Sequence, residues 1–353
     1  MSILMEVLRS AKYPEDVFGQ LNPLTERTLD LFYKQCMREV HPDVNHAVDA
    51  NDLAAKLQDL YQKAHISLRN GTFGCIKPLA TVRIQGNEYQ VFNELGKIIP
   101  RKNVVATSYP MSNDKNASQL DFFFDLVNHP RDNDLMTNEV KVLNHLFEDK
   151  KAHGYFRYLP SLFTHIDYRE GGLTRKANVF FARSNFVSLT EALQMYPHGI
   201  PAENVVWIIR RVLDVLGYIH KRGIIHSGVI PDNIFIGVGH NHEVELRGFY
   251  ASVFMEDKKY IPLLLDSKIM YPLEVLRKEV PTPSIDMYTF ANSIILLIDQ
   301  SSHGARYVIS FLNSMLFLSV QYREQSAYKL RDEFTQLTNR IWEKQKYLPF
   351  NKG

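Results

Sequence analysis

Cysteine, tryptophan and long hydrophobic runs are all scarce in this sequence. It holds two cysteines, Cys36 and Cys75, and two tryptophans. Because Cys36 falls on an apolar helical pattern, neither a disulfide nor a cysteine-rich metal site is expected. The longest apolar run, SIILLI at 293–298, is too short to cross a bilayer and lies between Asp286 and Asp299. This run predicts a buried core helix.

The chain also lacks an excess of charge of either sign. Its formal net charge is +2, which gives no reason to expect nucleic acid or a membrane surface as a partner. Hydrophobic residues make up 45% and charged residues 23% of the sequence, as in ordinary globular proteins. The first residues, MSILMEVLRSAKYPED, lack the features of a secretory signal, so a cytoplasmic location is expected. A chain of 353 residues can hold two or three domains, and we expect two.

Two amphipathic helices joined by a polar loop are predicted near the N-terminus. Apolar residues recur at helical spacing in two stripes, which are Leu29, Phe32, Tyr33, Cys36, Met37 and Val40, and then Leu53, Leu57, Leu60, Tyr61, Ala64 and Leu68. Pro42 disfavours helical dihedrals at His41 and ends the first helix. Asn51 or Asp52 is expected to cap the second helix. The segment HPDVNHAVDAND is therefore predicted to be the exposed tip of a helical hairpin.

The same segment carries a resemblance to a known module. FYKQCMREVHPDVN followed by LAAKLQDLYQKAHISL resembles helices two and three of a J-domain, through which co-chaperones engage 70-kilodalton heat-shock chaperones. The positions that match are Tyr33, His41, Pro42, Asp43, Leu57, Leu60 and Tyr61. PEDVFGQLN is similar to the short first helix of that family. The resemblance covers roughly the first 70 residues.

This resemblance implies a surface that binds a partner. His41, Pro42 and Asp43, together with Lys34 and Arg38, would contact the heat-shock chaperone and stimulate its ATPase, without chemistry on this chain. Lys34 and Arg38 belong to a basic stripe with Arg27 on the outer face of the first helix. The plainer alternative is that the proline simply stops a helix and that the basic stripe is a solvated face.

A second domain of a different kind follows. RNGTFGCIKP, at 69–78, is rich in turn-forming residues and marks a boundary. The predicted domains are 1–72 and 73–353. Strand-like runs such as ATVRI, EYQVF and LDFFFDLV come first, and from Glu203 the chain is mostly helical, with Gly223 ending one long helix. The predicted fold class is α+β: an all-α hairpin and then a two-lobed domain, with a small lobe at about 78–184 and a large lobe at about 185–350.

The two-lobed domain resembles protein kinases. YIHKRGIIHSGVIPDNIFIGVGHNHEVELRGFYAS is similar to their catalytic and metal-binding segment, and YPLEVL and SIDMYTFANSIILLI follow in kinase order. LTNEVKVLNHL is similar to the mobile helix of the small lobe. The positions that match are His226, Asp232, Asn233 and Phe249, with Glu139 as the glutamate of that helix and Asp286 as the residue that would brace the catalytic loop. The resemblance runs from about residue 80 onward.

Three residues that phosphoryl transfer requires are missing from the matching positions. Gly228 replaces the aspartate that accepts a proton, and Gly248 replaces the aspartate that binds magnesium. Phe124 or Asp125 stands where the phosphate-binding lysine belongs. The phosphate-covering loop keeps Gly96 but has bulky neighbours. The resemblance therefore implies a pseudokinase without a catalytic residue.

Few residues remain that could hold a metal. Asp232 and Asn233 alone make a poor magnesium site, because hard cations prefer several oxygen ligands. Asp232 also fits a turn after Pro231. GHNH, at 239–242, offers two histidines without a third ligand. We therefore expect no metal and no cofactor, while ATP with magnesium belongs to the alternative below.

The sequence thus predicts an adaptor. A J-domain-like segment would recruit a 70-kilodalton heat-shock chaperone, and the kinase-like domain would bind or scaffold an unknown client protein. The alternative is a nucleotide-dependent transferase with atypical kinase-fold chemistry, in which Glu139, Asp125, Asp232 and Asn233 contact metal or nucleotide. A third interpretation keeps both resemblances but gives the chain a partner unrelated to chaperones.

Overall fold

The computed structural model describes residues 3–11, 13–19, 21, 24–45, 47–69, 73, 78–95, 98–113, 120–183, 185–239, 243–263, 270–342 and 350. The chain forms two compact units, Met1–Lys77 and Pro78–Gly353, each of which is described by itself. The division falls a few residues after the predicted boundary at 72/73. Gly96 and the histidines of GHNH lie outside the described residues.

The first unit is helical, with α1 (Ile3–Ser10), α2 (Pro14–Phe18), α3 (Glu26–Val40) and α4 (Ala50–Arg69). Thr25 and Thr28 form a capping box that starts α3. The core contains the two predicted apolar stripes, including the buried Leu29, Cys36, Val40, Leu53, Leu57, Leu60 and Ala64. Across the α3 and α4 contact, the rings of Tyr33 and Tyr61 stack with centroids 3.9 Å apart. The two amphipathic helices therefore bury the faces that their periodicity predicts.

The predicted cap of the second helix was wrong. Because α4 begins at Ala50, Asn51 and Asp52 lie inside its first turn. The backbone amide of Leu53 donates to the carbonyl of Asp49, 2.9 Å away, so the helical pattern starts before the predicted caps. The carboxylate of Asp49 pairs with Arg9 of α1 at 2.8 Å. This contact between helices distant in sequence was not visible in the local pattern.

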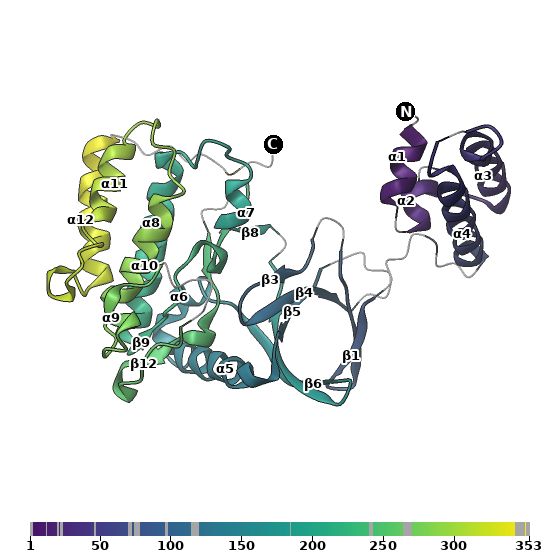
Figure 1. The fold of residues 1–353 in the computed structure, drawn as a ribbon. Coiled ribbons are helices and arrows are strands. Elements are labelled where there is room, and N and C mark those ends of the chain that lie inside the picture. Colours follow the sequence, from purple (N-terminus) through teal and green to yellow (C-terminus); the bar gives the residue numbers. More distant parts are fainter. Residues whose placement is uncertain are drawn as a thin grey trace. The chain divides into compact units, whose positions relative to one another are not determined.

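The small lobe of the second unit is an antiparallel sheet. Its strands are β1 (Ala80–Ile84), β2 (Asn87–Val91), β3 (Arg101–Lys102), β4 (Ala106–Ser112), β5 (Phe122–Val127), β6 (Leu162–Glu170) and β7 (Leu173–Phe181). The strands pair in the order β1-β2-β4-β5-β7-β6, and β3 pairs with β4. Figure 1 shows the sheet curling back on itself, with α5 (Asn133–Phe147) beside it. Apolar side chains from five of these strands form a buried cluster within the small lobe.

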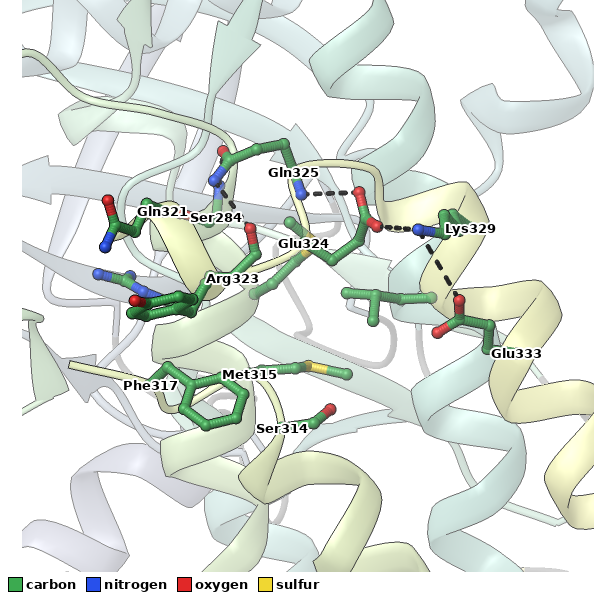
Figure 2. A pocket seen from close by; sticks show the side chains of 13 residues that line it. Ser284, Ser314, Met315, Phe317, Gln321, Arg323, Glu324, Gln325, Lys329 and Glu333 are labelled. Atoms are coloured by element: carbon green, nitrogen blue, oxygen red, sulfur yellow. Dashed lines mark hydrogen bonds and ion pairs between the residues drawn. The ribbon is translucent and has the colours of Figure 1, made fainter. Parts of the chain in front are cut away.

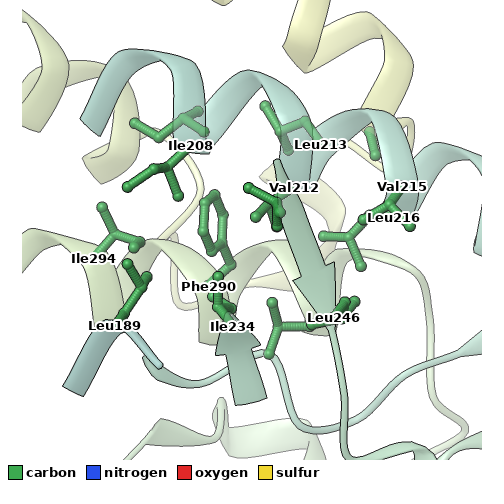
Figure 3. Close-up of a cluster of buried hydrophobic side chains, with 14 of the residues drawn as sticks. Leu189, Ile208, Val212, Leu213, Val215, Leu216, Ile234, Leu246, Phe290 and Ile294 are labelled. Carbon is green, nitrogen blue, oxygen red and sulfur yellow. The ribbon is translucent and has the colours of Figure 1, made fainter. Parts of the chain in front are cut away.

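The large lobe is built around α8 (Ala202–Lys221). Around it lie α6 (His153–Phe156), α7 (Leu189–Leu193), α9 (Leu273–Leu276), α10 (Ser284–Ile295), α11 (Ala305–Asn313) and α12 (Ala327–Ile341), with strands β8 (Phe186–Ser188), β9 (Ile224–Ile225), β10 (Ile234–Gly237), β11 (Val244–Leu246) and β12 (Val253–Phe254). Figure 3 shows side chains of α8 such as Val212 and Leu216 packing against Phe290 of α10 and against Ile234 and Leu246 of the strands. Because α8 is apolar on most of its surface, it lies in the centre of the lobe.

The apolar run SIILLI is buried only in part. Ile294 and Ile298 are 1% and 5% exposed, but Leu296 is 68% exposed. Helix α10 ends at Ile295, where the chain turns and the helical pattern no longer selects the buried face. The prediction of one buried helix across 293–298 was therefore wrong for its second half.

Candidate functional site

Asp286 fixes the loop that connects α8 to β10. Its carboxylate accepts hydrogen bonds from the backbone amides of His226 at 2.8 Å and Ser227 at 2.7 Å, and contacts Nε2 of His220 at 2.9 Å. Asp286 is fully buried on α10. Ser227 has a left-handed φ of +68°, and Tyr271 donates its hydroxyl to the Ser227 carbonyl at 2.8 Å. These contacts hold a strained loop conformation in place.

His226 connects this loop to the segment around Phe249. Its Nδ1 accepts from the amide of Gly228 at 3.2 Å, and its Nε2 lies 3.0 Å from the carbonyl of Arg247, to which it donates. The ring also packs edge-on against Phe249, with centroids 4.5 Å apart. Burial lowers the pKa of His226 to about 4. His226 is therefore a neutral structural residue, consistent with a tautomer protonated on Nε2.

Glu139 reaches the same segment from α5. It is 3% exposed, and its two carboxylate oxygens accept from Nδ2 of Asn178 at 2.8 Å and from the amide of Phe249 at 3.0 Å. Burial raises the pKa of Glu139 to about 7, against the opposing effect of the hydrogen bond from Asn178. In place of a lysine, Glu139 thus has an amide side chain and a backbone amide as partners.

Strand alternation decides between the two candidates for the missing lysine. Phe124 points into the apolar cluster of the small lobe and meets the ring of Tyr168 edge-on. Asp125 points to the opposite face and lines the cleft between the lobes. Burial raises the pKa of Asp125, while a hydrogen bond with Ser108 opposes this shift. A carboxyl group therefore takes the place of the cation.

Asn233 fills the space left by the two glycines. Its Nδ2 donates to the carbonyl of Gly228 at 2.9 Å, and its side chain bonds Tyr250. Gly248 lies directly against the Asn233 amide. Of the two residues that were predicted to remain from the metal-binding motif, Asp232 and Asn233, only Asp232 brings a carboxylate. Because the Asn233 side chain is already engaged and both glycines lack ligands, the site does not fit a magnesium ion of the kind that kinases use.

The cleft between the lobes brings together Asp125, Glu139, Asp232, Asn233 and Gly248. Its volume is about 160 Å³, which is the space of roughly five water molecules and less than typical ligand pockets. Four other predicted residues do not line the cleft but contact one another next to it, namely His226, Gly228, Phe249 and Asp286.

Among the cleft residues that sequence reasoning did not assign to the site, two are arginines. Arg101 of β3 and Arg247, which directly precedes Gly248, both line the cleft. Arg247 stands immediately before a matched motif, and this position could have drawn attention to it. Arg101 belongs to a basic pair with Lys102 in IIPRKN, which could contact an anion or be solvated surface, but its place in the cleft depends on how the strands pair.

A larger cavity of about 400 Å³ lies in the large lobe, between α10, the segment 314–325 and the start of α12. None of the predicted site residues lines it. Figure 2 shows Lys329 between Glu324 and Glu333, and Glu324 also accepts from the amide of Gln325 at 2.9 Å. Arg323, which also lines this cavity, pairs with Glu274 at 2.6 Å.

The tip of the first unit places His41, Pro42 and Asp43 between α3 and α4. His41 is the C-cap of α3, and the amide of Asp43 donates to His41 Nδ1 at 3.2 Å. The side chains of His41 and Asp43 are 45% and 85% exposed. Lys34 and Arg38 are also exposed, on α3.

Asn45 ties this tip to the rest of the unit. Its Nδ2 lies 3.1 Å from Sδ of Met5 on α1 and donates to the carbonyl of Glu39 at 3.2 Å. Its Oδ1 accepts from the amide of Ala47 at 3.0 Å. These contacts connect Asn45 to α1 and to the end of α3, and the tip presents the exposed side chains of His41 and Asp43.

Comparison with known proteins finds similarity to protein kinases. No protein-family model matches the chain. It is 25% identical over 169 residues, 47% of its length, to serine/threonine-protein kinase CST20 of Candida albicans and, at the same identity and length, to serine/threonine-protein kinase STE20 of Debaryomyces hansenii. The chain spans 12% and 14% of the lengths of these curated relatives. Vaccinia related kinase 3 matches in structure with a TM-score of 0.53 and 12% identity, over 74% of this chain and 92% of that one.

The chain therefore contains a protein-kinase-like fold, as predicted. By sequence, its similarity is to serine/threonine-protein kinases. Across the described ranges, no helix is both long enough and apolar enough to cross a membrane. Within the same ranges, no group of three or more His, Cys, Asp or Glu side chains is placed to hold a metal ion.

Proposed function

We propose that the kinase-like unit is a binding module that does not transfer phosphate by the usual kinase route. The observation that carries this proposal is the cleft itself, where Asp125 takes the place of a phosphate-binding cation. Gly228 and Gly248 bring no carboxylate, and Asn233 occupies the space beside them. An aspartate at this point repels a phosphate, and the positioning and electrostatic contributions to catalysis are lost together.

We propose further that the first unit is a J-domain-like module that docks onto a 70-kilodalton heat-shock chaperone. His41 and Asp43 are exposed at the end of two antiparallel helices, and the exposed Lys34 and Arg38 add positive charge on α3. The hydrogen bonds of Asn45 beside this tip support the proposal, because a preorganised surface loses little entropy on binding. In this adaptor, the kinase-like unit would hold a client protein for the chaperone.

The test is single-turnover ATP hydrolysis by a cytosolic 70-kilodalton chaperone in the presence of this protein. Wild type should stimulate hydrolysis, and His41→Gln should not, because the substitution changes an exposed group at the tip. Lys63→Gln is a matched control, since Lys63 is 58% exposed on α4 and pairs only locally with Asp59. Stimulation that survives in His41→Gln, or no stimulation with chaperones from several sources including the native host, contradicts the co-chaperone role.

A second candidate is a nucleotide-dependent transferase with atypical chemistry. The similarity to serine/threonine-protein kinases favours it over the co-chaperone role, and Glu139, Asp125, Asp232 and Asn233 all line one cleft. Calorimetric titration with ATP and magnesium distinguishes the two. Binding that requires magnesium and disappears in Asn233→Ala favours the transferase. Absence of binding at millimolar ATP favours the binding module.

A further inference from the structure

Two arginines that line the cleft each lie close to the same two phenyl rings, of which Phe235 also lines the cleft. Phe123 comes from β5 in the small lobe and Phe235 from β10 in the large lobe. Cζ of Arg101 lies 5.2 Å from the centroid of each ring. Cζ of Arg247 lies 5.1 Å from the Phe123 centroid and 4.2 Å from the Phe235 centroid. Planar guanidinium groups thus occupy a site where two aromatic rings could stack on a planar ligand.

The ion pairs of the two arginines differ in how far they are exposed to water. Arg247 pairs with Glu245, and their side chains are 11% and 3% exposed. Arg101 donates from Nε to Glu191 of α7 at 2.7 Å, but these side chains are 24% and 34% exposed. Because water screens a pair that is partly exposed, the Arg101 pair is the weaker of the two. It also joins the small lobe to the large lobe, so its release would free the cleft.

Polar groups in the closed cleft lack hydrogen-bond partners. Oδ1 of Asp125 and Nη2 of Arg247 are both buried without one. A buried polar atom without a partner costs free energy, and in a native structure such atoms often mark a place for a ligand or a water molecule. One acceptor and one donor therefore face a space that the chain's own side chains only partly fill.

We propose that Arg101 and Arg247 plug a stacking site for a planar heteroaromatic ligand between Phe123 and Phe235, and that Arg101 is the removable part of the plug. The cleft is then closed by an internal contact that a ligand, or a partner that draws Glu191 away, must break. This inference is independent of the proposed function, since it holds whether or not the opened cleft performs chemistry.

The test measures binding of adenosine, an uncharged probe with a planar heteroaromatic base, to the full chain by isothermal titration calorimetry. An uncharged probe is chosen because removal of an arginine alters the affinity for anions by itself. Arg101→Ala should bind the probe about tenfold more tightly than wild type, because the probe no longer competes with the stacked cation and its ion pair. Arg83→Ala, which removes an exposed arginine paired with Glu88 on the β1–β2 hairpin, should match wild type.

Two further variants locate the effect. Glu191→Gln keeps Arg101 but removes its anionic partner, so it should raise affinity by a smaller factor; it also serves if Arg101→Ala does not fold. Adding Phe235→Ala to Arg101→Ala should abolish the gained binding. Equal affinity in wild type and the Arg101 and Glu191 variants, absence of binding in all of them, or a gain that survives Phe235→Ala overturns the proposal.

Discussion

Replacing Glu139 with glutamine is expected to remove a large pH dependence from the unfolding of the kinase-like unit. Burial raises the pKa of this carboxyl from 4.5 to about 7. Between these two values the folded state binds the proton more tightly than the unfolded state does. The stabilisation is therefore fully present below pH 4.5 and is lost as the pH rises through 7. The difference between the two pKa values corresponds to about 3 kcal/mol of unfolding free energy.

Urea unfolding at a series of pH values between these limits measures the effect. Trp207 and Trp342 both belong to the second unit, so tryptophan fluorescence follows that unit alone. Wild type should lose about 3 kcal/mol more than Glu139→Gln as the pH rises across this range. The readout is this difference in slope, because glutamine meets two hydrogen-bond donors and lowers stability at every pH.

The matched control is Glu148→Gln at the end of the same helix. Glu148 is 68% exposed, so its replacement should leave the pH dependence as in wild type. Asp125, whose pKa burial also raises, is present in every variant and contributes with the same sign. If Glu139→Gln and wild type lose the same stability between the two limits, burial does not raise the pKa of Glu139 and the reasoning fails.

Other substitutions test the supports of the fold by urea unfolding. Asp286→Ala leaves two buried backbone amides without an acceptor and should cost about 3–5 kcal/mol; a cost below about 1 kcal/mol would contradict the bracing role. Glu274→Gln breaks the ion pair with Arg323 at 2.6 Å, whose side chains are 4% and 1% exposed, and should cost about 3 kcal/mol. Tyr61→Phe removes the hydrogen bond to Asp30 at 2.6 Å and should cost the first unit about 1 kcal/mol by circular dichroism, whereas an unchanged midpoint would show that water replaces the bond.

The elements of the fold were largely predictable because each carries a local periodicity. Apolar residues spaced three and four apart predicted the helices α3 and α4. The long apolar pattern from Glu203 predicted the helix α8. Helix ends were less predictable. The cap at Asn51 or Asp52 failed because α4 begins at Ala50, and the pair that Asp49 forms there with Arg9 joins residues far apart in sequence, which no local pattern contains.

The candidate site was predictable where a motif fixes a position and not where contacts decide it. The order of the motifs located Glu139, Asn233 and Asp286, although their hydrogen-bond partners required the structure. Strand geometry could have chosen Asp125 over Phe124, because Asp125 is the one polar residue of FFFDLV and side chains two positions apart, such as Phe122, Phe124 and Leu126, share the face that packs into the cluster. The stacked arginines could not be predicted, since their positions depend on two lobes meeting.

The contact between Gly248 and Asn233 bears on how this chain could change with time. A β-carbon at position 248 would lie 2.6 Å from Cγ of Asn233, and the backbone there has a φ of +81°, which side chains rarely adopt. An aspartate cannot return to this position by one substitution without moving its neighbour. A larger residue at 248 must therefore displace the Asn233 side chain and strain the backbone, and both effects lower the stability of the protein. An engineer who places a metal-binding aspartate at position 248 must therefore find another side-chain conformation for Asn233, the residue that kinases also use as a metal ligand.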